Sequence, residues 1–220
     1  MNLVGAMVWK DIHSFLHDWR TLASVAILAL ALPCLLFFTG LASVLTVDAG
    51  LVAASVMVTV FLAYTLTWKS FSYERVENAL ASVLASPISV LELFLGKSLA
   101  VFLFGYPFLL AGAITVSCGL DVKMGAFPSI SAFAMALLAI PVCGLAIAEL
   151  MGALFLLMGN FEVVRYAGFA LAAVMFDMAF FNQEAFSHLR VIAIFSLSGL
   201  ATAVVIAVLF ARVSKPRLAK

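Results

Sequence analysis

Long apolar runs alternate with short polar stretches along this chain, and six runs are long enough to cross a bilayer, whose core takes about 20 residues of α-helix. The runs cover about residues 21–46, 50–68, 99–118, 130–157, 166–182 and 191–211. Stretches such as VAILALALPCLLFF are apolar on every side and lack the alternation of a barrel strand. Because backbone groups in lipid need internal partners, the pattern predicts an all-α integral membrane protein with six transmembrane helices.

Composition supports this fold class. Of the 220 residues, 66% are hydrophobic and 10% are charged, whereas soluble domains carry about 25% charged residues. The formal net charge of +1 offers no electrostatic basis for binding nucleic acid. We expect one transmembrane domain over residues 1–220, in contact with membrane lipids. The first apolar run is too long for a signal-peptide core, so we expect the N-terminus to be retained.

Lysine and arginine positions predict the orientation. With six helices, the N-terminus, residues 69–98, the turn at 158–165 and the C-terminal tail lie on one side. Ten of the twelve Lys and Arg residues fall on that side, and only Lys123 and Arg190 fall on the other. Positive residues favour the cytoplasmic side. We therefore expect a multi-pass protein of the cell (plasma) membrane with both termini in the cytoplasm.

Residues 3–19 are too polar to span and predict an amphipathic interfacial helix. One face carries the apolar residues Val8, Ile12, Phe15, Leu16 and Trp19. The other face carries the polar residues Lys10, His13, Ser14, His17 and Asp18. Two histidines four residues apart are a metal-ligand spacing, but a site needs further ligands. Because His188 is expected across the membrane, we interpret the pair as part of a solvated face.

The segment 69–98 is the one sizeable polar feature between spans. Val76, Leu80, Val83 and Leu84 follow one helical face. The helix is expected to stop at Ser86-Pro87, where Ser86 can cap a new helix that runs from Ile88 to Lys97 into the third span. A plain connector would not need two helical periods around a capped break. The ending LGKS is no phosphate-binding loop, because Leu91 stands where that motif needs glycine.

The stretch YERVENALASVLASPISVLELFLGKSLAVFLF resembles the segment after the second span of ABC-2 type ABC transporter permeases. Residues that match the family pattern are Leu80, Val83, Leu84, Ser86, Pro87, Ile88, Ser89, Gly96 and Lys97. The N-terminal helix resembles the family's elbow helix, and six spans with both ends inside are its topology. Haem-exporter permease subunits are similar in size and form a subfamily option.

The resemblance implies a cytoplasmic coupling helix over residues 74–86 that docks on a separate ABC ATP-binding subunit. The residues expected at that contact are Glu74, Arg75, Val76, Glu77, Leu80, Val83, Leu84, Ser86 and Pro87. It further implies an exporter that pairs with a second permease subunit, as homodimer or heterodimer. ATP and Mg would bind the partner, and this chain would carry no cofactor, no metal and no enzymatic activity of its own.

Two features inside the fourth span leave alternatives open. Glu149 is an ionisable group at membrane depth, which marks a functional candidate by default. It could pair with a cation, line the translocation path, or cap a helix end while protonated. Gly144, Ala148 and Gly152 have a spacing that permits close helix packing, either between two subunits or within the chain.

Two other classes compete with a permease. An ATP-independent carrier or channel would be expected to show inverted repeats and several charges at mid-membrane, and this sequence offers only Glu149. A membrane enzyme would need a cluster of catalytic side chains at one interface, which the scattered candidates do not form. We therefore expect a permease subunit driven by a partner ATPase, with an ATP-independent carrier or channel as the alternative.

Overall fold

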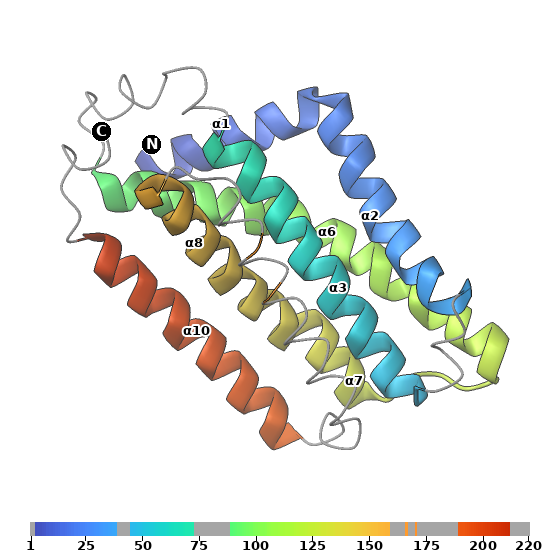
Figure 1. Ribbon diagram of the computed structural model, residues 1–220. Helices are drawn as coiled ribbons and strands as arrows, with labels where there is room; N and C mark the ends of the chain where they lie inside the picture. The colour runs from blue at the N-terminus through green and yellow to red at the C-terminus, as the bar shows by residue number, and fades with distance from the viewer. Residues whose placement is uncertain are drawn as a thin grey trace.

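The structure, a computed structural model, describes residues 3–38, 45–72, 89–158, 166, 170 and 189–211. Regular structure in these ranges is helical throughout (Figure 1). The elements are α1 (Leu3–His17), α2 (Trp19–Phe38), α3 (Val47–Thr67), the π-helical turn η2 (Trp68–Ser72), α6 (Val90–Met124), α7 (Ile130–Ala134), the π-helical turn η3 (Met135–Ala139), α8 (Ile140–Met158) and α10 (Leu189–Ala211).

Four of these helical stretches are long and apolar enough to cross a membrane. They run over Val47–Phe71, Val90–Val122, Ile130–Leu156 and Ile192–Leu209, and a shorter apolar helix covers Trp19–Ala31. The chain is therefore an all-helical protein with the composition of a membrane protein. The predicted span at 166–182 lies outside the described residues, apart from Tyr166 and Ala170.

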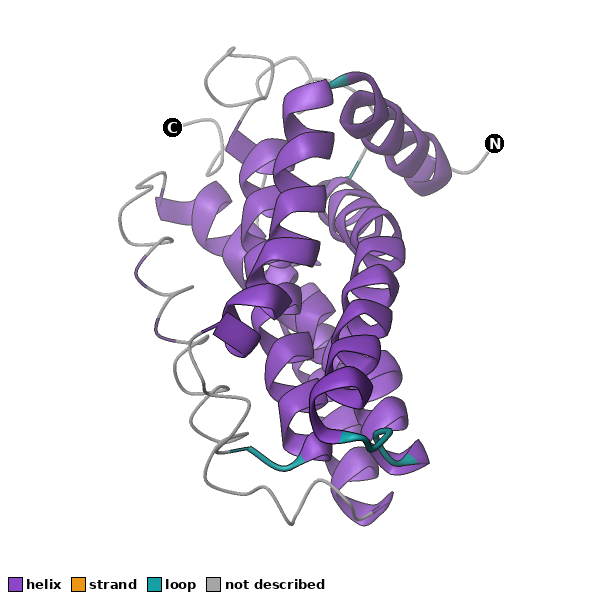
Figure 2. Cartoon of the chain, turned by 90° about the vertical axis from the view of Figure 1, so that its right-hand side faces the viewer, coloured by secondary structure: helices purple, strands orange, loops and turns teal. Residues whose placement is uncertain are grey.

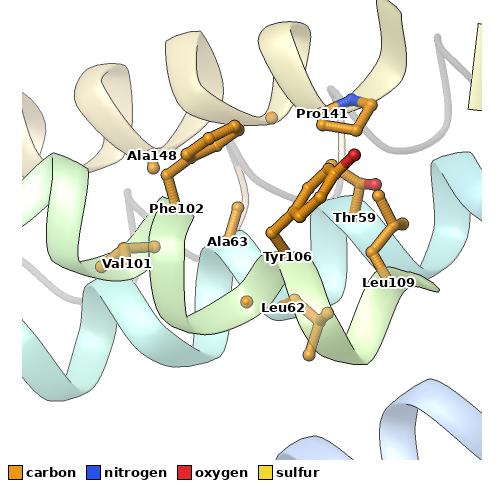
Figure 3. Close-up of a pocket in the computed structure, with 11 residues that line it drawn as sticks. Thr59, Leu62, Ala63, Val101, Phe102, Tyr106, Leu109, Pro141 and Ala148 are labelled. Carbon is orange, nitrogen blue, oxygen red and sulfur yellow. The ribbon is translucent and has the colours of Figure 1, made fainter. Parts of the chain in front are cut away.

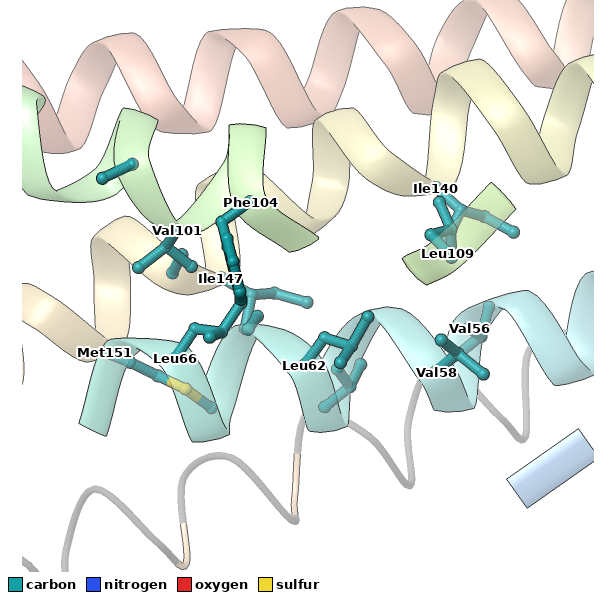
Figure 4. Close-up of a cluster of buried hydrophobic side chains, with 14 of the residues drawn as sticks. Val56, Val58, Leu62, Leu66, Val101, Phe104, Leu109, Ile140, Ile147 and Met151 are labelled. Atoms are coloured by element: carbon teal, nitrogen blue, oxygen red, sulfur yellow. The ribbon is translucent and has the colours of Figure 1, made fainter. Parts of the chain in front are cut away.

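Helix α3 forms the centre of the bundle. Its apolar window is 78% buried, against 17% for α10, which packs along α8 and leaves most of its surface free of described neighbours. Helices α2, α6 and α8 all contact α3, and α1 lies across the end where η2 ends and α6 begins (Figure 2). Figure 4 shows the apolar layer between α3, α6 and α8, which includes Leu66, Phe104 and Ile147.

Small residues let these helices approach closely. A Cβ added at Gly152 would lie 2.7 Å from the Phe71 ring, and one added at Gly144 would meet the methyl group of Thr59. The stripe of Gly144, Ala148 and Gly152 therefore packs within the chain, against α3 and η2. Of the two roles left open by the sequence, the internal contact is the one observed.

Helix α6 begins later than the sequence predicted. Ser89 is its N-cap: its hydroxyl accepts from the Glu92 N–H at 3.1 Å, and the Ser89 N–H donates to the Glu92 carboxylate at 2.8 Å. This reciprocal capping box fixes the start at Val90 rather than Ile88, with Ser89 rather than Ser86 as the cap. From Val90 the helix continues to Met124, through Pro107, so the predicted short helix and the third span form one element.

Candidate functional site

The predicted docking residues lie outside the described residues. Glu74, Arg75, Val76, Glu77, Leu80, Val83, Leu84, Ser86 and Pro87 all belong to residues 73–88. The structure does describe both flanks of that segment, which are η2 on one side and the capped start of α6 on the other. These flanks meet α1 at a buried polar cluster.

The cluster consists of Asp11 from α1, Ser70 from η2 and Lys97 from α6. The Lys97 ammonium donates to the Ser70 carbonyl at 2.6 Å and lies 3.4 Å from Asp11 Oδ2. The Ser70 hydroxyl donates to the same Asp11 oxygen at 2.5 Å. The side chains of Lys97 and Asp11 are 2% and 7% exposed, so this ion pair is held out of water.

Apolar contacts on both sides of the cluster position its charges. Met7, Asp11 and Phe15 are the buried residues of α1, at four-residue spacing on one face. Phe15 stacks on Phe104 with ring centroids 5.1 Å apart. An added Cβ at Gly96 would lie 2.8 Å from the Met7 Cβ, so this glycine lets α1 rest directly on α6. These contacts hold α1 against α6 on both sides of Asp11, about one helical turn before it at Met7 and one turn after it at Phe15.

The aromatic residues of η2 complete the surroundings of the cluster. The Lys97 ammonium lies 5.4 Å from the centre of the Phe71 ring, a cation–π distance. Phe71 also packs on Phe94, and Trp68 packs on Phe155 of α8. A buried charge that has an opposite charge, a carbonyl and a ring as neighbours is satisfied. The cluster therefore joins α1, η2 and α6 through groups that satisfy one another.

A second ion pair ties the turn after α1 to η2. Asp18 Oδ2 accepts from the Lys69 ammonium at 2.6 Å and from the Thr21 hydroxyl at 2.9 Å, and Asp18 Oδ1 accepts from the Arg20 N–H. The hydrogen bond from Lys69, helped by those from Thr21 and Arg20, lowers the pKa of Asp18 to about 2. Asp11 and Asp18 therefore each accept a hydrogen bond from η2, from the neighbouring residues Ser70 and Lys69.

The two histidines of α1 lie on its exposed face. The His13 and His17 rings have centroids 3.9 Å apart, and the His17 Nδ1 lies 3.0 Å from the His13 carbonyl oxygen. Trp9 stacks on His13 to continue this row of rings. Over the described ranges, no group of three His, Cys, Asp or Glu side chains comes close enough to hold a metal ion.

Glu149, the candidate for the translocation path, is buried on α8 with 3% of its surface exposed. Its Oε2 has no hydrogen-bond partner among the described residues. The contacts of Gly144 with Thr59 and of Gly152 with Phe71 place Glu149 level with the last turn of α3. There Thr67 Oγ1 is also buried, and it too lacks a partner in the described part of the chain. Within the described ranges, Glu149 has no hydrogen bond or ion pair to any residue of the Asp11 cluster, whose members bond to one another.

Sequence reasoning missed Asp11 and Ser70. It assigned Leu16 and Trp19 to the apolar face of an interfacial helix together with Phe15; of these three, only Phe15 is buried within the protein, and Leu16 and Trp19 are 52% and 70% exposed. The sequence did contain a sign of this site, because Asp11 lies midway between the apolar residues Met7 and Phe15 on one face of the helix. A charge inside an apolar stripe predicts a buried partner of opposite charge, here Lys97.

We find no protein family, no curated protein and no solved structure that matches this chain.

Proposed function

We propose that this chain is the membrane-spanning permease subunit of an ABC transporter of the ABC-2 type, and that it works as an exporter. A separate ATP-binding subunit docks on residues 74–86 and drives transport. In this proposal the protein has six spans, lies in the plasma membrane with both termini in the cytoplasm, and pairs with a second permease subunit. ATP and Mg bind the partner subunit.

The observation that carries the proposal is the buried Asp11–Ser70–Lys97 cluster. Ser70 lies just before residues 73–88, and Lys97 lies in the third turn of the helix that follows them. A force applied to the docking segment therefore reaches α3 and α6 at two points that are bonded to each other and to α1. A passive connector would not need its ends bonded to each other and held to α1 by a desolvated ion pair, since such pairs are costly to bury.

The length and continuity of the two helices that flank residues 73–88 also support the proposal. Helix α6 runs without interruption from Ser89 to Met124, the full depth of a bilayer, and α3 with η2 does the same from Val47 to Ser72. Continuous helices transmit displacement along their axes. Movement at residues 73–88 is thereby passed to the core of the bundle, where α3 and α6 both contact α8.

Co-purification from the native membrane tests this proposal. The expected partner is a subunit that hydrolyses ATP, and the double variant Leu80→Asp, Val83→Asp should abolish its recovery because it places charges at two apolar anchors. Ser82→Asp is the matched control, since it adds a charge to the predicted polar face of the same segment. If both variants retain the ATPase equally, residues 74–86 do not form the docking site.

An ATP-independent carrier or channel is the alternative outcome. Reconstitution separates the two classes: the purified chain alone should leave a substrate gradient unchanged, and the chain with its ATPase should transport only when ATP is present. Uptake or efflux by the chain alone would refute the proposal. In the same assay, Glu149→Gln tests the translocation-path role, because a variant that transports normally removes Glu149 from the path.

A further inference from the structure

A small cavity lies between α3, α6 and α8, in the core of the candidate spans (Figure 3). Its volume is about 40 Å³. Small residues make room for it: Ala63 on α3, Gly105 on α6, and Gly144 and Ala148 on α8. Leu62, Val101 and Leu109 contribute apolar walls. The cavity is distinct from the Asp11 cluster, and no residue of that cluster lines it.

Two stacked aromatic rings form the mouth of this cavity. All lining residues are buried except Phe102 and Tyr106, which are half-buried. These neighbours on α6 have ring centroids 5.9 Å apart and both project toward α8 (Figure 3). Because they lie at mid-length of a candidate span, between Val90 and Val122, the mouth faces the bilayer rather than water. A molecule that reaches the cavity arrives from the lipid phase.

The ring of Tyr106 is held in place by a hydrogen bond to the π-helical turn η3. Pro141 has no N–H to donate to the carbonyl of Leu137, four residues earlier. The Tyr106 hydroxyl donates to this carbonyl at 3.1 Å and so joins α6 to η3, the turn that leads into α8. Its oxygen can still accept a hydrogen bond. The cavity wall therefore contains an acceptor that is fixed in position.

Thr59 supplies a second polar group to the cavity. It is 7% exposed, and its methyl group faces Gly144. Its hydroxyl has no hydrogen-bond partner in the described part of the chain. A buried hydroxyl without a partner costs about 1–3 kcal/mol. The cavity thus offers one unused hydroxyl and one tyrosine oxygen among walls that are otherwise apolar.

We propose that this cavity binds the hydroxyl-bearing end of a membrane-dissolved amphiphile, with Thr59 as the group that recognises the hydroxyl. The amphiphile is of the long-chain alcohol class. Its hydroxyl exchanges hydrogen bonds with Thr59 and Tyr106, and its alkyl chain leaves past the Phe102 and Tyr106 rings into the bilayer. A water molecule takes about 10–15 Å³ by the same measure, so the cavity admits a hydroxymethyl group and one or two further carbons.

Water alone suits this cavity less well than an alcohol. A buried water makes two to four hydrogen bonds to polar groups. Only Thr59 and Tyr106 offer side-chain polar groups here, so most of the volume would border on apolar walls. An amphiphile satisfies Thr59 and at the same time fills the apolar remainder. The proposal concerns the chain by itself and stands whether or not an ATPase drives it.

Photolabelling of the purified full-length chain in lipid nanodiscs tests the site. The probe is octan-1-ol that carries a diazirine next to its hydroxyl end, and adducts are located by peptide mass spectrometry. Adducts are expected on α3 near Thr59 and on α6 at residues 102–106, and excess unlabelled octan-1-ol should remove them. A second probe, with the diazirine at the tail, should shift the adducts to the mouth and to lipid-facing positions.

Three variants make the test specific. Thr59→Val keeps the shape of the side chain and should lower competable labelling about fivefold, which is the loss expected for one neutral hydrogen bond. Thr115→Val is the matched control on α6, because its hydroxyl donates to the Ala111 carbonyl at 2.8 Å outside the cavity. Ala63→Val adds two methyl groups to the wall and should also reduce labelling.

Each possible result either supports or overturns the proposed alcohol site. Each variant is first checked for native helix content and for a single species in size-exclusion chromatography. Labelling that is spread over exposed α10 and is not removed by octan-1-ol would overturn the proposal. So would labelling of Thr59→Val at the wild-type level, or an absence of adducts at the cavity, which would indicate that water or side chains fill it.

Discussion

Replacing Lys97 with methionine tests how much the buried cluster stabilises the junction. The substitution keeps most of the length of the side chain, one atom short of lysine, but leaves Asp11 buried and without its cation. At 3.4 Å the two charges attract by about 5 kcal/mol for an effective dielectric constant of about 20. Desolvation offsets part of this attraction, and breaking a buried pair from one side costs about 3–5 kcal/mol. We expect Lys97→Met to destabilise the protein by an amount in that range.

A double-mutant cycle isolates the ion pair from other effects. Removing both charges with Asp11→Asn and Lys97→Met should recover a large part of the loss, because a neutral amide can still bond to Ser70. We expect a coupling free energy of about 2 kcal/mol or more. Lys69→Met is the control: it breaks the Asp18–Lys69 pair, whose side chains are 26–28% exposed. That exposed pair should be worth under about 1 kcal/mol.

The assay has a local and a global part. Tryptophan fluorescence during unfolding in mixed detergent micelles reports this end of the bundle, since Trp9, Trp19 and Trp68 all lie on or beside the junction. Hydrogen exchange across residues 3–17 reports whether α1 detaches first. The reasoning is refuted if Lys97→Met costs less than about 1 kcal/mol, or if the two single effects simply add.

Three further outcomes follow from the same region. Gly96→Ala brings a methyl group to within 2.8 Å of the Met7 Cβ, so it should cost about 1–3 kcal/mol and speed hydrogen exchange in α1; an unchanged exchange rate would contradict the contact. Ser89→Ala should lower stability by about 1 kcal/mol through loss of the helix cap, whereas Ser89→Asp should retain most of it. Because the Asp18 pKa falls from 3.8 to about 2 beside Lys69, the stabilisation from this pair should be complete above about pH 4 and lost as the pH falls through 2. Asp18→Asn should remove that acid-dependent part in a fluorescence titration, and a variant with the wild-type acid profile would contradict the assignment.

The apolar runs located the long helices of the described residues, α2, α3, α6, α8 and α10, because lipid requires every backbone group to be bonded within its own segment. They did not give the exact helix ends. Helix α6 begins at Val90, two residues after the predicted Ile88, because the capping box of Ser89 and Glu92 fixes its start. Helix α3 likewise continues through η2 to Ser72. The polar residues Lys69 and Ser70 can lie in this last helical turn because they bond to Asp18 and Asp11.

The site was harder to predict than the fold. Helical periodicity predicts that polar residues lie on the water-facing side of a helix. Asp11 is an exception because Lys97, 86 residues later in the sequence, lies opposite it in the fold. No local pattern shows such a pairing. The stripe of small residues at Gly144 and Gly152 was visible in the sequence, but whether it met α3 or another subunit depended on the tertiary arrangement.

The π-helical turn η2 sets the register in which Ser70 meets Asp11. A π-turn holds one residue more than an α-turn, and each residue of an α-helix turns the chain by about 100°. Converting Trp68–Ser72 to regular α-helix would rotate Ser70 away from Asp11 and would turn everything after Ser72 by about that angle. The hydrogen bond between Ser70 and Asp11 therefore favours the π-helical form of η2 over a regular α-helix, and the carboxylate of α1 helps to fix the direction in which the chain leaves α3.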